Sequence, residues 1–86
     1  QENYLRTYPN PFSDKLCIEF YSVDSQNVTI ELYDIAGHLI LKKKVPVKLT
    51  SFNQIILDEL GSLGQGTYII RLTSKKETYQ DQIIRM

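Results

Sequence analysis

The chain has 86 residues, and its ten basic and ten acidic side chains give no net charge. A chain of this length can bury one modest core, so we expect a single domain over residues 1–86. The balanced charge argues against a nucleic-acid or anionic-membrane partner, no apolar run reaches the roughly 18 residues of a membrane span, and the single cysteine excludes an internal disulfide.

Residues 1–7 are expected to form a linker or a first strand. The segment Tyr8–Phe12 contains two prolines, which fix φ and lack an amide donor, so it is not helical. From residue 16 onward apolar and polar residues alternate with a period of two, which indicates strands with one buried face. The positions expected to face the core are Leu16, Ile18 and Phe20; Val28, Ile30 and Leu32; Leu39, Leu41 and Val45; Tyr68, Ile70 and Leu72; and Ile84 and Met86.

Polar or glycine-containing segments separate these strands and are predicted to be turns. They comprise residues 22–27, 34–38, 61–66 and 74–77. In the second of them, Gly37 is expected to supply the positive φ of a hairpin connection. Six or seven short strands at roughly ten-residue spacing therefore predict an all-β fold, an immunoglobulin-like antiparallel β-sandwich.

The residue types that carry catalysis or hold metals are too few for a site. Cys17 is the single thiol and His38 the single imidazole. We expect one within a strand and the other beside a turn, with no third residue to orient them. One cysteine and one histidine do not make a structural zinc site, and the aspartates are not clustered as a calcium loop requires. We therefore expect no enzyme activity and no cofactor.

Two other features concern binding. Lys42–Lys44 is interpreted as protection of an edge strand, because charge there prevents edge-to-edge pairing. The six tyrosines lie in separate segments, and an aromatic body with a polar tip also suits a carbohydrate ligand. The alternative function is therefore a non-catalytic carbohydrate-binding or adhesion β-sandwich module appended to a secreted hydrolase.

Three stretches carry a resemblance to a known family. The first, residues 8–16, begins Tyr-Pro-Asn-Pro-Phe, and the second, residues 28–39, contains Tyr-Asp-Ile-Ala-Gly. The third, residues 63–72, contains Gly-Thr-Tyr and is followed by the closing residues 79–86. In this order and spacing they resemble the C-terminal sorting domain of the type IX (Por) secretion system of Bacteroidetes. The resemblance covers nearly the whole chain and implies an immunoglobulin-like sandwich at the tail of a secreted cargo protein.

The resemblance also assigns recognition residues. The family's Pro-Asn-Pro motif, its Gly-x-Tyr motif and its closing strand all have counterparts here, although the family often has Lys at Gln82 and Arg or Lys at His38. Four basic side chains of the last two strands and of the turn between them are expected to point outward, where a receptor reads shape, charge or a strand edge. The predicted recognition residues are Pro9, Asn10 and Pro11 of the first motif, Gly66 and Tyr68 of the second, the basic Arg71, Lys75 and Lys76, and Ile83, Ile84 and Arg85 of the closing strand.

The function implied by the resemblance is a secretion and sorting signal without chemistry of its own. In the family, the domain reaches the periplasm, is recognised by the outer-membrane type IX translocon and is removed by a sortase-like cysteine peptidase, which leaves the cargo secreted or attached to the cell surface. The implied partners are this translocon, this peptidase and an upstream cargo domain. The opening residues Gln1–Asn3 are expected to follow a cut from a longer precursor, and the domain is expected to be a monomer.

Overall fold

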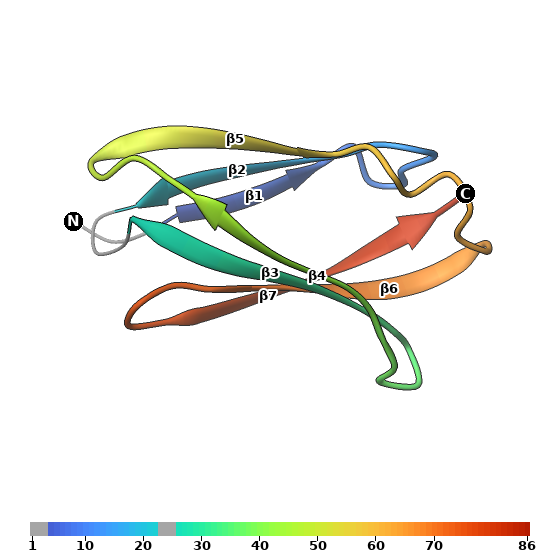
Figure 1. The fold of residues 1–86 in the computed structure, drawn as a ribbon. Coiled ribbons are helices and arrows are strands. Elements are labelled where there is room, and N and C mark those ends of the chain that lie inside the picture. The colour runs from blue at the N-terminus through green and yellow to red at the C-terminus, as the bar shows by residue number, and fades with distance from the viewer. Residues whose placement is uncertain (1–3, 23–25) are drawn as a thin grey trace.

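The structure is a computed structural model that describes residues 4–22 and 26–86 (Figure 1). These described residues form seven strands and no helix. The opening residues Gln1–Asn3 and part of the predicted loop 22–27 lie outside the described residues. The strands are β1 Tyr4–Tyr8, β2 Leu16–Ser22, β3 Asn27–Asp34, β4 Leu39–Pro46, β5 Ser51–Leu57, β6 Gly66–Thr73 and β7 Thr78–Arg85.

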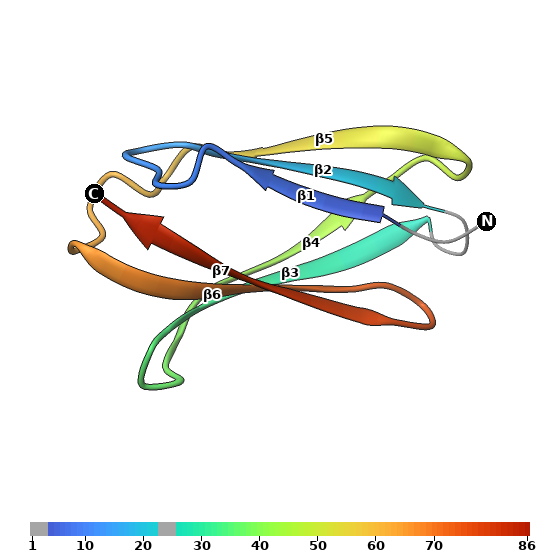
Figure 2. The same ribbon diagram turned by 180° about the vertical axis from the view of Figure 1, so that it is seen from behind.

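The strands form two facing sheets (Figures 1 and 2). One sheet has the order β1-β2-β5 and the other the order β4-β3-β6-β7, and every neighbouring pair is antiparallel. The second strand thus pairs with the first and the fifth, while the third pairs with the fourth and the sixth, and the sixth with the seventh. This Greek-key order is that of immunoglobulin-like sandwiches, so the predicted fold class is confirmed.

The core lies between the two sheets and follows the alternation read from the sequence. Burial of apolar area at about 25 cal/mol per Å² is the main favourable contribution to folding. The expected core positions of β2, β3 and β6 are confirmed. The core comprises Phe12, Leu16, Ile18, Phe20, Val28, Ile30, Leu32, Val47, Ile55, Leu57, Leu60, Tyr68, Ile70, Leu72 and Ile83.

Strand β4 differs from the prediction that Leu39 and Leu41 share a buried face. Leu41 pairs with Leu32 and packs on the core, whereas Leu39 pairs with Tyr33 and is 51% exposed. The register shifts between these two pairs because Ile40 is an extra residue on β4. An extra residue reverses the faces on one side of a bulge, so Leu39 lies on the outer face of the sheet.

The closing strand β7 also buries the opposite face from the one predicted. Ile83 is fully buried, while Ile84 is 45% exposed and Met86 is exposed. The cause is the pairing with β6, in which Tyr68 lies opposite Ile83 and Thr67 opposite Ile84. Residues directly opposite each other in an antiparallel pair share a face, so the buried Tyr68 places Ile83 in the core.

Strand β5 was not located from the sequence. Its inward residues Ile55 and Leu57 are buried, but its outward residues include the exposed Phe52 and Ile56. Apolar side chains on both faces remove the contrast between alternate positions on which the prediction of strands depends.

Edge and turn features agree with the sequence. Lys42–Lys44 lie on β4, at the edge of its sheet, and Lys43 pairs with Glu59 at 2.8 Å. In the β3–β4 connection, Gly37 has a φ of +90°, which a glycine adopts without a steric penalty. The Asp34 side chain accepts hydrogen bonds from the amides of Ala36 and His38.

The Asp34 carboxylate gives the fold an acid-sensitive turn. The hydrogen bond from the His38 amide is the main cause that lowers the pKa of Asp34 below its ordinary value of 3.8. A carboxyl group whose pKa is lower in the folded than in the unfolded chain stabilises the folded state at pH values above its unfolded pKa. This stabilisation is lost as the pH falls through the folded pKa.

We therefore expect Asp34→Asn to be less stable than wild type at neutral pH. In urea titrations the difference should shrink as the pH falls from about 6 to about 2.5. A difference that is constant with pH would contradict this role of the carboxylate.

The bulge in β4 makes a second prediction. Leu32→Ala should lower the free energy of unfolding by about 3 kcal/mol, because it leaves a cavity in the core. Leu39→Ala on the outer face should cost less than about 1 kcal/mol. Urea denaturation measures the free energy of unfolding of both variants. Equal losses of this free energy would place Leu39 in the core instead.

Candidate functional site

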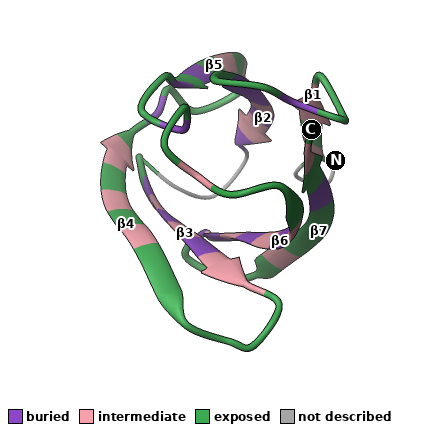
Figure 3. Cartoon of the chain, turned by 90° about the vertical axis from the view of Figure 1, so that its right-hand side faces the viewer, coloured by how far each residue is buried: buried purple, intermediate pink, exposed green. Residues whose placement is uncertain are grey.

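The first and last sequence motifs meet at one end of the sandwich. This end, here called the motif end, comprises residues 9–12, 61–68 and 82–86. Figure 1 shows the C-terminus there beside the β1–β2 and β5–β6 connections, and Figure 3 looks onto the same end. The opposite end carries the start of β1 and the β6–β7 turn.

The side chain of Asn10 binds the closing strand through both of its polar atoms. Its Nδ2 donates to the carbonyl oxygen of Gln82 at 3.2 Å, and its Oδ1 accepts from the amide of Ile84 at 3.0 Å. Both peptide bonds that precede the prolines of this segment, Tyr8–Pro9 and Asn10–Pro11, are cis. An amide side chain matches one backbone donor and one backbone acceptor at once, so Asn10 substitutes for a neighbouring strand along β7.

Phe12 continues this pairing with its own backbone. Its amide donates to the carbonyl of Ile84 at 2.8 Å, and its carbonyl accepts from the amide of Met86 at 3.0 Å. Phe12 forms a parallel bridge with Arg85, and its side chain is fully buried. The first motif therefore covers the outer edge of β7 near the C-terminus and fills the core beneath it.

The Gly-x-Tyr motif has a structural role at the same end. The Tyr68 hydroxyl donates to the carbonyl of Gly64 at 2.7 Å, and its ring contacts Phe12 edge to face at a centroid distance of 6.4 Å. A tyrosine near the start of the sixth strand that bonds back to the preceding connection is the tyrosine corner of immunoglobulin-like folds. Gly66 has a φ of +142°, a conformation that side-chain-bearing residues rarely adopt.

Arg85 differs from the expectation that it points outward. Its Nη2 donates to the carbonyl of Gly61 at 3.3 Å and its Nη1 to that of Met86. Its Nε is buried without a partner among the described residues. The guanidinium thus joins the β5–β6 connection to the C-terminus.

The remaining basic recognition residues lie away from the motif end. Arg71 is half-buried on the outer face of the four-stranded sheet, where its guanidinium lies 5.1 Å from the centre of the Tyr33 ring and donates to Gln80. Lys75 and Lys76 are exposed in the β6–β7 turn at the opposite end. The structure therefore gathers the first motif, the Gly-x-Tyr motif and the closing strand, but not Arg71, Lys75 and Lys76.

Sequence reasoning missed two contributors to the motif end. Phe12 was part of a recognised stretch but was given no role, although a fully apolar residue directly after Pro11 signals a buried anchor. Gly61 contributes a backbone carbonyl to Arg85. A carbonyl is present at every residue, so no sequence signal distinguishes the one at Gly61.

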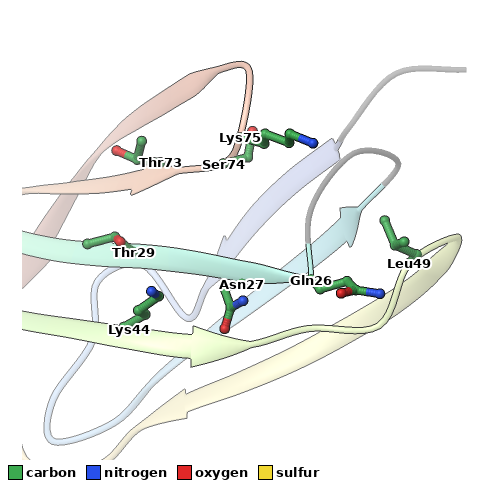
Figure 4. Close-up of a pocket in the computed structure, with 8 residues that line it drawn as sticks. All are labelled: Gln26, Asn27, Thr29, Lys44, Leu49, Thr73, Ser74 and Lys75. Atoms are coloured by element: carbon green, nitrogen blue, oxygen red, sulfur yellow. The ribbon is translucent and has the colours of Figure 1, made fainter.

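Other candidate sites do not assemble in the described part of the chain. Cys17 lies on β2 and His38 follows the other sheet's β3, where its Nδ1 is 3.0 Å from Asp34. Residues 4–22 and 26–86 contain no group of three or more His, Cys, Asp or Glu suited to a metal ion and no helix long and apolar enough to cross a membrane. An open, polar hollow of about 520 Å³ lies at the opposite end, beside Thr29, Lys44 and Thr73 (Figure 4).

Comparison with known proteins finds a matching family model and a similar protein. A family model described as "Secretion system C-terminal sorting domain" matches residues 6–86, nearly the whole chain. The chain is also 30% identical over 81 residues to an endo-acting ulvan lyase of Formosa agariphila. This match covers 93% of the chain but 14% of the lyase. The resemblance noted in the sequence is therefore confirmed.

The two hydrogen bonds of Asn10 lead to a prediction about the closing strand. Asn10→Ala should lower the free energy of unfolding by about 1–2 kcal/mol, because it removes two hydrogen bonds worth about 1 kcal/mol each. It should also speed hydrogen exchange at the Ile84 amide. Gln65→Ala, an exposed residue of the β5–β6 connection, is the control and should stay within about 0.5 kcal/mol of wild type. Unchanged exchange at Ile84 would show that Asn10 does not hold β7.

Proposed function

This chain belongs to the family of secretion system C-terminal sorting domains, and it therefore acts as a sorting signal for export and for secretion or cell-surface attachment. On this premise we propose that the signal is the folded motif end. The secretion machinery would read it as one surface built from the first and last segments of the chain. The domain itself performs no catalysis.

The observation that carries the proposal is the pairing of residues 10–12 with β7. Two hydrogen bonds from the Asn10 side chain and two from the Phe12 backbone hold the last residues of the chain in one conformation. A binding segment that is ordered beforehand loses little conformational entropy when a partner binds. The first motif and the closing strand, although distant in sequence, are therefore both needed to form this surface.

The surface available at the motif end includes four exposed apolar side chains. Pro9 and Pro11 are exposed on the first motif, and Ile84 and Met86 are exposed on the closing segment. Tyr68 and Ile83 are buried, so they support this surface and do not contact a receptor. Exposed apolar side chains on a rigid frame are typical of protein-binding sites.

Family membership supports the finer steps, which are part of the proposal. The partners are the outer-membrane type IX translocon, which meets the domain in the periplasm, and a sortase-like cysteine peptidase, which removes it. The cargo is an upstream domain of a longer protein.

The test is export of a folded reporter that carries this chain at its C-terminus, in a bacterium with this secretion system. We expect Ile84→Glu to leave the reporter in the periplasm, because a charge on the exposed apolar surface opposes burial against a receptor. Ile56→Glu, at a similarly exposed isoleucine on the other sheet, is the matched control and should be exported like wild type. Cell fractionation and the reporter's mass report location and cleavage.

Two results would contradict the proposal. Full export of Ile84→Glu would show that the motif end is not the surface read. Equal loss with Ile56→Glu would show that the effect is not specific to that surface. Circular dichroism of the purified chains confirms that both variants are folded.

A further inference from the structure

The outer face of the three-stranded sheet carries side chains in rows that run across β1, β2 and β5. Tyr4 pairs with Tyr21, and Tyr21 pairs with Phe52, so the three aromatic residues form one row. Paired residues share a face of the sheet. Tyrosines that are 17 residues apart in sequence, together with a phenylalanine of β5, therefore form one aromatic surface.

Direct ring contacts hold this aromatic row in place. The Phe52 ring meets Tyr21 at 4.9 Å and Tyr4 at 6.3 Å between centroids, both edge to face. Phe52 is nevertheless 60% exposed and Tyr4 48% exposed. Edge-to-face contacts stabilise ring orientation, so the row is an ordered and solvent-facing apolar surface that the core does not require.

The next row on this face is polar and its charges cancel. It consists of Arg6, Glu19 and Gln54, which are paired across the three strands. The Arg6 guanidinium lies 3.9 Å from the Glu19 carboxylate. These planar groups have donors and acceptors to spare without a net charge that would select an ion.

A second apolar row lies beyond the polar one. Tyr8 and Ile56 flank Cys17 there, and Ile56 is exposed. The Arg6 guanidinium lies 4.7 Å from the centre of the Tyr8 ring, and the Gln54 amide donates to the Tyr8 hydroxyl at 3.4 Å. The face thus alternates between apolar and hydrogen-bonding rows.

We propose that this face binds a neutral polysaccharide. A pyranose ring has an apolar face of C–H bonds, which the negative face of an aromatic ring attracts, and hydroxyl groups at its rim. Aromatic and planar polar rows that lie side by side match both parts of a sugar. The cancelled charge of Arg6 and Glu19 favours uncharged sugars over acidic ones.

The spacing of the rows suits a narrow ligand. Three strands at about 4.8 Å spacing and three rows at about 7 Å spacing place the backbone positions of this face on a grid of roughly 10 Å by 14 Å. A single extended glycan chain fits along such a grid.

The aromatic row of the proposed glycan surface lies away from the sorting surface. The aromatic row lies at the end where β1 begins, opposite the motif end, and on the other sheet from Ile84. The same domain can therefore carry an export label and hold a glycan. Each role is tested by variants that leave the other unchanged.

The test is affinity electrophoresis of the 86-residue chain in native gels that contain laminarin, pullulan or hydroxyethylcellulose as neutral probes, and alginate as an acidic probe. We expect retardation by at least one neutral probe that persists at about 0.5 M salt, which screens exposed charges. Phe52→Ala should weaken this binding by about tenfold or more, as expected for an aromatic hot spot, and Gln54→Ala should weaken it less. Leu39→Ala removes a similarly exposed apolar side chain from the other sheet and is the matched control.

Three results would overturn the proposal: no retardation by any neutral probe, equal retardation of wild type and Phe52→Ala, or retardation by alginate alone that salt abolishes. Sedimentation of the free chain adds a fourth, because self-association that Phe52→Ala removes would make a second copy the occupant. Thermal unfolding of each variant confirms that a loss of binding is not a loss of folding. Export of the Phe52→Ala reporter at the wild-type level would show that the glycan surface and the sorting surface are separate.

Discussion

The pairing of residues 10–12 with the end of β7 is the constraint on which the motif end depends. A strand at the edge of a sheet has unpaired polar backbone groups unless other parts of the chain supply partners. Here the Asn10 side chain and the Phe12 backbone satisfy the outer polar groups of β7, while the Phe12 ring fills the core. Without them, Ile84 and Met86 would lie on a mobile tail and not on a defined surface.

The other motifs strengthen the same end. Tyr68 contacts Phe12 and fixes the β5–β6 connection through Gly64, and Arg85 fixes it through Gly61. Further along the same side, Thr7 of β1 donates to Asp81 of β7 at 2.9 Å. These contacts join the first and last thirds of the chain, so the motif end depends on the fold of the whole domain.

The domain presents two different surfaces. The motif end has exposed apolar side chains on a rigid frame, suited to a protein receptor, whereas the outer face of the three-stranded sheet has alternating rows suited to a sugar chain. Both surfaces use exposed apolar residues that the core does not need, so single substitutions of these residues leave the core intact.

The sequence by itself determined the strands in which one face is apolar and the other polar. The alternation placed Leu16, Val28 and Ile70 in the core, and Gly37 marked the hairpin, because both signals are local. The order of the motifs likewise identified the family and most residues of the motif end.

Only the tertiary structure decided register and contact between distant segments. The extra residue in β4 places Leu39 on the outer face of its sheet. The pairing with Tyr68 buries Ile83 and leaves its equally apolar neighbour Ile84 exposed. In β5, apolar side chains on both faces prevent the strand from being located by alternation. The contact of Asn10 with Ile84 spans 74 residues, and no local pattern contains it. Alternation fixes which residues of a strand share a face, but the hydrogen-bonded neighbour fixes which face is buried.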